Sequence, residues 1–280
     1  MVAKHTLRRV EVKKLSTLAS RRRKLKGVII AASCACALVL FVLISRYDGL
    51  QIKNIIIEGA THVSGEDIKK KIESILSGNY PLWIPKNNTL FLPRSAISAA
   101  VLADYLPLEG LTIHRTGLNS LSVEVSERPL SYLWCGDVPN DINECYFVDG
   151  SGLIFQKGVT VESGGPLIIY APHQGGLLGG QVLTRQIFVN TLALFAVAER
   201  AGIVVNKIVA NDVEINLYTK DDWVIYAPND MRISSASGVL DAALHSSAFT
   251  KDTAFNNLEY IDLRYSPKVY YKYGESNPAP

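Results

Sequence analysis

The first part of the sequence has almost no acidic residues, and the part that follows has no charge at all. Residues 1–26 contain one acid, Glu11, against ten Lys and Arg, a local charge of +9. Since the whole chain carries +3, the remaining residues together carry −6. Residues 27–45 are uncharged, which excludes a helix exposed to water on all sides. At ~1.5 Å per residue this run rises about 28 Å, so it predicts a transmembrane helix.

The basic residues predict which way the helix crosses the membrane. Lys and Arg are concentrated in cytoplasmic flanks, so we expect residues 1–26 to be a cytoplasmic arm and residues 46–280 to lie outside. The expected location is the cytoplasmic (inner) membrane. Basic arms can also bind nucleic acid. Because an apolar run directly follows this arm, we interpret its charge as a signal that orients the helix in the membrane. No nucleic-acid partner is expected.

Two other interpretations of this N-terminal segment are less consistent with its length. A cleaved signal peptide has a shorter basic region and an apolar run of about 7–15 residues. A lipoprotein would be anchored at Cys34, but the apolar run continues past this residue, and Ala31 occupies a position where Leu would be expected. The pattern favours an uncleaved signal anchor.

Cysteine is scarce, with four residues in 280, which excludes a disulfide-dense scaffold. Cys34 and Cys36 lie in the apolar run, where they act as small apolar residues. Cys135 and Cys145 flank a polar loop in the part expected outside the membrane, where disulfides persist. A bridge that closes this loop and a pair of free thiols are both compatible with the sequence.

Signature motifs of extracytoplasmic enzymes are absent from the sequence. It has no Ser-x-x-Lys, Gly-x-Ser-x-Gly, His-Glu-x-x-His or Cys-x-x-Cys. Asp221 and Asp222 are expected on a strand, where neighbouring side chains face opposite ways and cannot share a substrate. The five histidines fall in different expected elements: His5, His62, His114, His173 and His245. We therefore expect no catalytic residues, no cofactor and no metal.

Residues 46–126 predict a small first domain outside the membrane. A strand-like run over 52–58 precedes Ser64-x-x-Asp67, a capping-box variant at the start of a helix. Pro93 opens a second helix, and two alternating strands follow over 111–125. The expected order is β-α-α-β-β.

Residues 127–273 predict a mixed or antiparallel β domain with flanking helices, so the whole chain is expected to be α+β. One helix is expected over 183–200 and a short one over 237–248. Residues 274–280 are expected to be a disordered tail.

Several motifs in this order resemble the FtsQ/DivIB family of bacterial cell-division proteins over about residues 1–273. They are Ile52, Ile55, Ile57, Gly59, Ser64, Asp67 and Ile68, then Glu127-Arg128-Pro129, Phe147-Val148-Asp149 with Gly152 and Phe155, and Ile261-Asp262-Leu263-Arg264-Tyr265. The first group is similar to a POTRA module. The chain departs from the family pattern in a long loop at Tyr80–Asn88, in Gly117–Leu121 and in the segment from Cys135 to Cys145.

The resemblance implies a scaffold of the division machinery at the septum that catalyses no reaction. It implies contacts with small membrane proteins of the FtsB (DivIC) and FtsL types, and through them an influence on the septal wall synthase. A membrane-anchored extracytoplasmic enzyme and another POTRA-type envelope assembly factor are the alternatives.

The end of the sequence, LEYIDLRYSPKVYYK, predicts two short strands around Pro267. A last strand at a sheet edge leaves backbone groups that a partner strand can pair with. Its tyrosines offer rigid contact area. The alternative is that they only cover the core of the domain, and the family resemblance favours partner contact. The expected partner-binding residues are Arg264, Tyr265, Lys268, Val269, Tyr270, Tyr271 and Lys272.

Overall fold

The computed structural model describes residues 3–139, 144–158, 165–246, 248–249, 255 and 257–274. The chain divides into two compact units, one of Met1–Ala103 with Gly110–Ser126 and one of Asp104–Glu109 with Glu127–Pro280. The mixed α+β class and the N-terminal apolar helix expected from the sequence are both observed. Of the expected tail, residues 275–280 lie outside the described residues.

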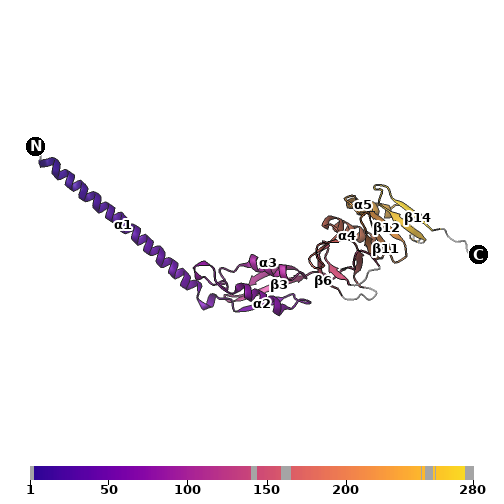
Figure 1. The fold of residues 1–280 in the computed structure, drawn as a ribbon, viewed down its shortest axis with the longest axis horizontal. Helices are drawn as coiled ribbons and strands as arrows, with labels where there is room; N and C mark the ends of the chain where they lie inside the picture. Colours follow the sequence, from indigo (N-terminus) through magenta and orange to yellow (C-terminus); the bar gives the residue numbers. More distant parts are fainter. Residues whose placement is uncertain are drawn as a thin grey trace, which may run out of the picture. The chain divides into compact units, whose positions relative to one another are not determined.

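The first unit begins with α1 (Ala3–Ser45), a continuous helix (Figure 1). Its segment Lys24–Ser45 is long and apolar enough to cross a membrane. Apolar side chains such as Val28, Leu40 and Leu43 are exposed along it. They have no protein surface to pack against, as lipid-facing side chains require.

A three-stranded sheet and two helices form the rest of the first unit. The sheet order is β1-β3-β2, and β1 runs parallel to β3. The Ser64 hydroxyl accepts a hydrogen bond from the Asp67 backbone N–H and caps α2, as expected. The elements are η1 (Asp48–Leu50), β1 (Asn54–Glu58), α2 (Gly65–Leu76), η2 (Pro81–Trp83), α3 (Arg94–Asp104), β2 (Leu108–Arg115) and β3 (Ser120–Glu127). Both helices pack apolar faces on the sheet, through buried Ile68, Ile72, Ile97 and Val101.

The second unit is built on a nine-stranded mixed sheet with the order β14-β13-β12-β11-β10-β7-β4-β5-β6. A separate two-stranded hairpin, β8–β9, follows β7 in the sequence. The strands are β4 (Tyr132–Trp134), β5 (Tyr146–Val148), β6 (Ile154–Lys157), β7 (Leu167–Tyr170), β8 (His173–Gln174), β9 (Gln181–Val182), β10 (Val205–Ala210), β11 (Glu214–Thr219), β12 (Val224–Pro228), β13 (Leu258–Asp262) and β14 (Tyr270–Tyr273).

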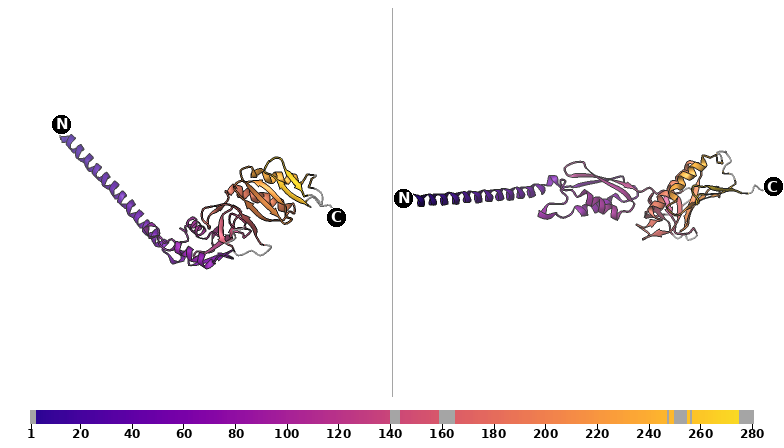
Figure 2. Two further views of the ribbon diagram at one scale, coloured as in Figure 1. Left: turned by 45° about the vertical axis from the view of Figure 1, so that its right-hand side comes forward. Right: turned by 90° about the horizontal axis from the view of Figure 1, so that it is seen from above.

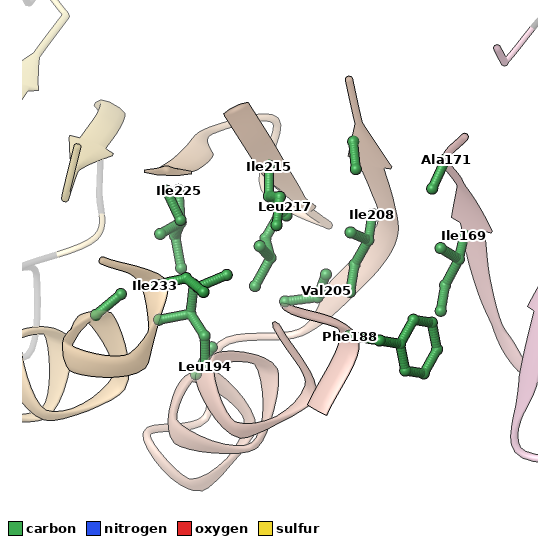
Figure 3. Close-up of a cluster of buried hydrophobic side chains, with 14 of the residues drawn as sticks. Ile169, Ala171, Phe188, Leu194, Val205, Ile208, Ile215, Leu217, Ile225 and Ile233 are labelled. Carbon is green, nitrogen blue, oxygen red and sulfur yellow. The ribbon is translucent and has the colours of Figure 1, made fainter. Parts of the chain in front are cut away.

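Two helices, α4 (Arg185–Arg200) and α5 (Ile233–Leu244), cover one face of this sheet (Figure 2). The core lies between them and the strands (Figure 3). Phe188 and Leu194 of α4 belong to the same buried cluster as Ile208 and Leu217 of the central strands, and all four are almost fully buried. The core therefore centres on β10, β11 and β12, away from the last strand.

Two local expectations are wrong. The short helix expected over 237–248 begins at Ile233 and ends at Leu244. An Asp230 carboxylate oxygen accepts from the Arg232 backbone N–H just before it, and Ile233 is fully buried, so the first turn is fixed by a local hydrogen bond and by packing. Asp221 and Asp222 lie in the turn between β11 and β12 instead of on a strand, with Asp222 at a φ of 62°.

Candidate partner-binding edge

The last strand, β14, is an edge strand of the nine-stranded sheet. It pairs antiparallel with β13, with Tyr271 opposite Ile261 and Tyr270 opposite Asp262. On its other side no strand is present among the residues that the structure describes. All four of its side chains are exposed. Its outward backbone groups are therefore available to a strand that adds to the sheet.

A turn over Arg264–Pro267 connects β13 to β14. The Lys268 backbone N–H donates to the Tyr265 carbonyl at 3.2 Å, and the Ser266–Pro267 peptide is cis. The turn presents Tyr265 with 61% of its surface exposed.

Two carboxylates fix the Arg264 side chain beside this turn. Nε and Nη2 donate to the two Asp262 oxygens at 3.0 and 2.7 Å, and Nη1 donates to Glu214 of β11. These hydrogen bonds, with that to Asp262 the strongest cause, raise the pKa of Arg264 further above its usual value. Asp262 is buried. The guanidinium therefore neutralises a buried charge and is held in one orientation.

Aromatic rings gather around Arg264 on one face of the sheet. Its guanidinium carbon lies 5.0 Å from the ring centroid of Tyr226 and 5.9 Å from that of Tyr265. Tyr265 also meets Tyr270 edge to face, with centroids 5.8 Å apart. Burial raises the pKa of Tyr226. The two exposed tyrosines are thus held by ring contacts and form a surface with apolar rings and polar hydroxyl groups.

The opposite face of β14 borders a groove against α5. Val269 packs on the core, and Tyr271 meets Phe249 edge to face at 5.1 Å. The groove encloses about 830 Å³. Small residues of α5 line its floor: Ser234, Ser235, Gly238, Ala242 and Ala243. A strand added at β14 could place alternate side chains over the tyrosines and into this groove.

The two lysines near the edge differ. The Lys272 ammonium lies 2.6 Å from a Glu259 carboxylate oxygen on β13, and this hydrogen bond raises the pKa of Lys272. Lys268 is exposed in the segment before β14. Lys272 is therefore engaged with the neighbouring strand, while both charges stay at the surface.

All seven residues expected to bind a partner lie at this edge, in the turn or in the segment Lys268–Lys272. That they contact a partner stays a prediction. Sequence reasoning missed Glu214, Tyr226 and Phe249, which hold Arg264 and Tyr271 in place. Glu214 alternates with the apolar residues Val213 and Ile215, a pattern that indicates a polar face but does not show which cation faces Glu214.

Cys135 and Cys145 form a disulfide, the first of the two alternatives left open by the sequence. Nearby, His173 Nδ1 lies 3.3 Å from an Asp137 carboxylate oxygen, and its ring packs 4.6 Å from that of Trp134. His173 begins the hairpin β8–β9. Within the described residues, no group of three or more His, Cys, Asp or Glu could hold a metal ion.

Arg128, from the Glu127-Arg128-Pro129 motif, forms an ion pair with Asp149. Its Nε also donates to the Leu106 carbonyl at 2.9 Å. Asp149 accepts in addition from the backbone N–H groups of Ser151 and Leu153. These contacts join the Glu127-Arg128-Pro129 and Phe147-Val148-Asp149 motifs within the second unit.

No protein-family model matches this chain, and no curated protein matches it.

Proposed function

We propose that the protein is a membrane-anchored scaffold of the bacterial division machinery, similar in role to FtsQ/DivIB proteins, and that it catalyses no reaction. The observation that carries this proposal is β14, which exposes all four side chains at a sheet edge where the described part of the chain places no further strand. The core is centred on other strands. The edge is thus available for binding without disrupting the fold.

The proposed topology places the basic arm in the cytoplasm and both units outside, across the cytoplasmic membrane at the septum. The charge asymmetry around α1 supports this orientation. A reporter fused after residue 280 should be active only outside the cytoplasm. Activity confined to the cytoplasm would contradict the topology.

The first unit is proposed to be a POTRA module that governs recruitment to midcell. Its β-α-α-β-β order and the parallel pair β1–β3 support this assignment. Deletion of residues 52–126 should abolish midcell localisation while leaving the protein in the membrane. Unchanged localisation would assign recruitment to another part of the chain.

The second unit is proposed to bind FtsB- and FtsL-type membrane proteins through β14, and through them to affect the septal wall synthase. A proline cannot donate a hydrogen bond to an added strand. Either Tyr270→Pro or Tyr271→Pro, whichever N–H faces outward, should therefore block capture of these partners in a pull-down with the full chain. The Tyr→Ala variant at the same position, which keeps the backbone N–H, is the matched control, and circular dichroism checks the fold of both.

Depletion of the protein in its host tests the cellular role. Filamentous, undivided cells are expected. Normal division with an altered envelope permeability would instead indicate a POTRA-type assembly factor, and turnover of wall fragments that is lost on changing one polar residue would indicate an enzyme.

A further inference from the structure

Exposed apolar side chains in the first unit are concentrated near the end of α1. Between residues 46 and 126, the described large apolar side chains with high exposure are Tyr47, Ile56, Trp83, Leu90 and Leu118. Trp83, at 72%, is the most exposed of them. All but Ile56 come from three segments that are hydrogen-bonded to one another. We call Tyr47, Trp83, Leu90 and Leu118 the apolar patch.

Backbone and side-chain hydrogen bonds join the long loop after α2 to the end of α1. The Asn88 side-chain amide donates to the Ser45 carbonyl at 2.6 Å, and Asn88 is fully buried. The Thr89 backbone N–H donates to the Leu50 carbonyl at 2.8 Å. The Arg46 Nε donates to the carbonyl of Trp83 at 3.2 Å. The loop is therefore tied directly to the point where the apolar helix ends.

The hairpin turn between β2 and β3 joins the same cluster. The Lys53 backbone N–H donates to the Asn119 carbonyl at 2.8 Å, next to Leu118 in the chain. Arg115 Nη1 donates to the Thr89 carbonyl at 3.2 Å. Leu118 is thus held close to the segments that carry Tyr47 and Leu90.

One contact places this loop at the depth of the apolar helix. The rings of Phe41 and Phe91 meet edge to face with centroids 5.6 Å apart. Phe41 lies within the segment that can cross a membrane and precedes Ser45 by four residues, or about 6 Å along the helix at ~1.5 Å per residue. If α1 spans a bilayer, Phe91 must reach the same depth as Phe41, within the ~5–10 Å interfacial layer.

The backbone at Trp83 is held in an unfavourable conformation. Its φ is 57°, a region that costs a bulky residue energy. The side chain displayed by this conformation is mostly exposed, so packing within the chain does not account for it. Trp and Tyr concentrate at membrane–water interfaces, where a ring can sit among acyl carbonyl groups.

Basic side chains flank the apolar patch. Arg46, Lys53 and Arg115 are exposed beside it, and Lys86 lies in the same loop as Trp83. Asp48 is the nearby acid, and it pairs with Lys53 at 3.3 Å. Apolar rings with flanking cations are the composition that binds an anionic lipid surface.

We propose that the apolar patch rests in the lipid interface of the membrane that α1 spans, with Trp83 inserted among the headgroups and upper acyl chains. The occupant is lipid, because the patch adjoins a helix that is itself lipid-exposed and because Phe91 contacts that helix inside its apolar segment. The patch would hold the first unit against the membrane surface. This inference depends on α1 crossing a membrane and is independent of the proposed role in division.

Tryptophan fluorescence can test the proposal, because the chain contains three tryptophans and only Trp83 is exposed. Trp134 and Trp223 are 3% and 0% exposed. The full chain is reconstituted into vesicles of phosphatidylethanolamine and phosphatidylglycerol, with and without lipids brominated near the carbonyl end of the acyl chain. The Trp83 emission is the difference between the wild-type protein and Trp83→Phe.

That difference emission should be blue-shifted, should lose most of its intensity with the brominated lipids and should resist aqueous iodide. A matched control is the double variant Trp83→Phe with Glu58→Trp, which puts an exposed tryptophan at the far end of β1, about 13 Å along the strand from Asn54 at ~3.3 Å per residue. Its added emission should be quenched by iodide and little affected by bromine.

Strong iodide quenching of Trp83 without bromine quenching would overturn the proposal and would mean that the patch faces water or awaits a protein partner. Equal bromine quenching of tryptophans at positions 83 and 58 would also overturn it. Contact with lipid would then involve the whole first unit and would not be specific to the apolar patch. If the wild-type protein shows the expected bromine quenching but does not act at midcell, the division proposal alone fails and the lipid contact stands.

Discussion

The two edges of the nine-stranded sheet differ in what covers them. At the β6 edge, the Ile154 backbone N–H donates to the Gly180 carbonyl at 2.9 Å, and its carbonyl accepts from Gly179 at 2.8 Å. Leu153 forms a bridge with Gln181. Hairpin β8–β9 and its glycine-rich loop thus cover this edge at Leu153 and Ile154, and Ile154 and Phe155 are buried. At the other edge, β14 exposes every side chain.

Among the residues that the structure describes, a hairpin occupies the β6 edge and no strand pairs with the β14 edge. An uncovered edge strand favours aggregation unless something occupies or protects it. In this chain the uncovered edge also has the aromatic rings, the fixed arginine and the groove. The difference therefore supports the use of β14 for binding.

Breaking the covered edge should cost the most stability. Gly152 has a φ of +87°, and a Cβ there would lie 2.4 Å from Gln181 Nε2 and 2.8 Å from the Val182 carbonyl. Gly152→Ala should lower the free energy of unfolding by about 3 kcal/mol, through backbone strain and overpacking. Urea unfolding in a Trp83→Phe background reports the second unit, since Trp134 and Trp223 both lie in it.

Gly150→Ala is the matched control for this experiment, because no atom lies within 4 Å of the added Cβ at Gly150. It should leave the free energy of unfolding nearly unchanged. Equal destabilisation by both substitutions would show that the hairpin is not closely fitted to the edge.

The disulfide near the covered edge should contribute the next largest stability. It joins Cys135 and Cys145, ten residues apart in sequence, and a loop of this size corresponds to about 2–3 kcal/mol in the chain-entropy model. The double variant Cys135→Ala, Cys145→Ala should lose that amount in the same unfolding assay. Reductant should then lower the free energy of unfolding of the wild-type protein and leave that of the variant unchanged. A decrease in the variant would indicate an effect unrelated to the bridge.

At the uncovered edge the effect should be on affinity and not on stability. Tyr265 is mostly exposed, and its side chain contacts Tyr270 and the Arg264 guanidinium. Tyr265→Ala should weaken partner binding by about 1–3 kcal/mol, or about 5- to 150-fold, if this ring is central to the interface. Binding of the full chain to immobilised partner measures it, and Tyr218→Ala, a tyrosine of β11 under Lys207, serves as a control ring.

Much of the first unit could be predicted from sequence, because local patterns determine it. The helix cap at Ser64, the apolar face of α2 and the alternating strands require only neighbours in the chain. The covered edge could not be predicted, since glycines at 179 and 180 pair with Ile154 across more than twenty residues. Likewise Glu214 and Arg264 are fifty residues apart, and only the sheet order brings them together.

The smallest effect on stability is expected at Lys272, on the uncovered edge itself. Its ion pair with Glu259 is exposed, and exposed pairs contribute little. Because that pair raises the pKa of Lys272, its contribution is present at neutral pH and is lost only as the pH rises through the raised pKa, in the alkaline range. Lys272→Gln should therefore leave urea unfolding at neutral pH unchanged within error.

Lys272 should also matter for preventing self-association at this edge. A charge on an exposed edge strand opposes pairing with a second copy of the chain. The double variant Lys268→Gln, Lys272→Gln should self-associate more in detergent solution than the wild type, as measured by analytical ultracentrifugation, and Tyr271→Pro or Tyr270→Pro in the same background should reverse this. The β6 edge supplies the control. Lys157→Gln removes a charge from the end of β6, whose Ile154 backbone groups are already bonded to Gly179 and Gly180, so it should not promote association. Association promoted equally at both edges would mean that general loss of charge, and not an available backbone, is the cause. The contrast between the two edges would then not support strand addition at β14.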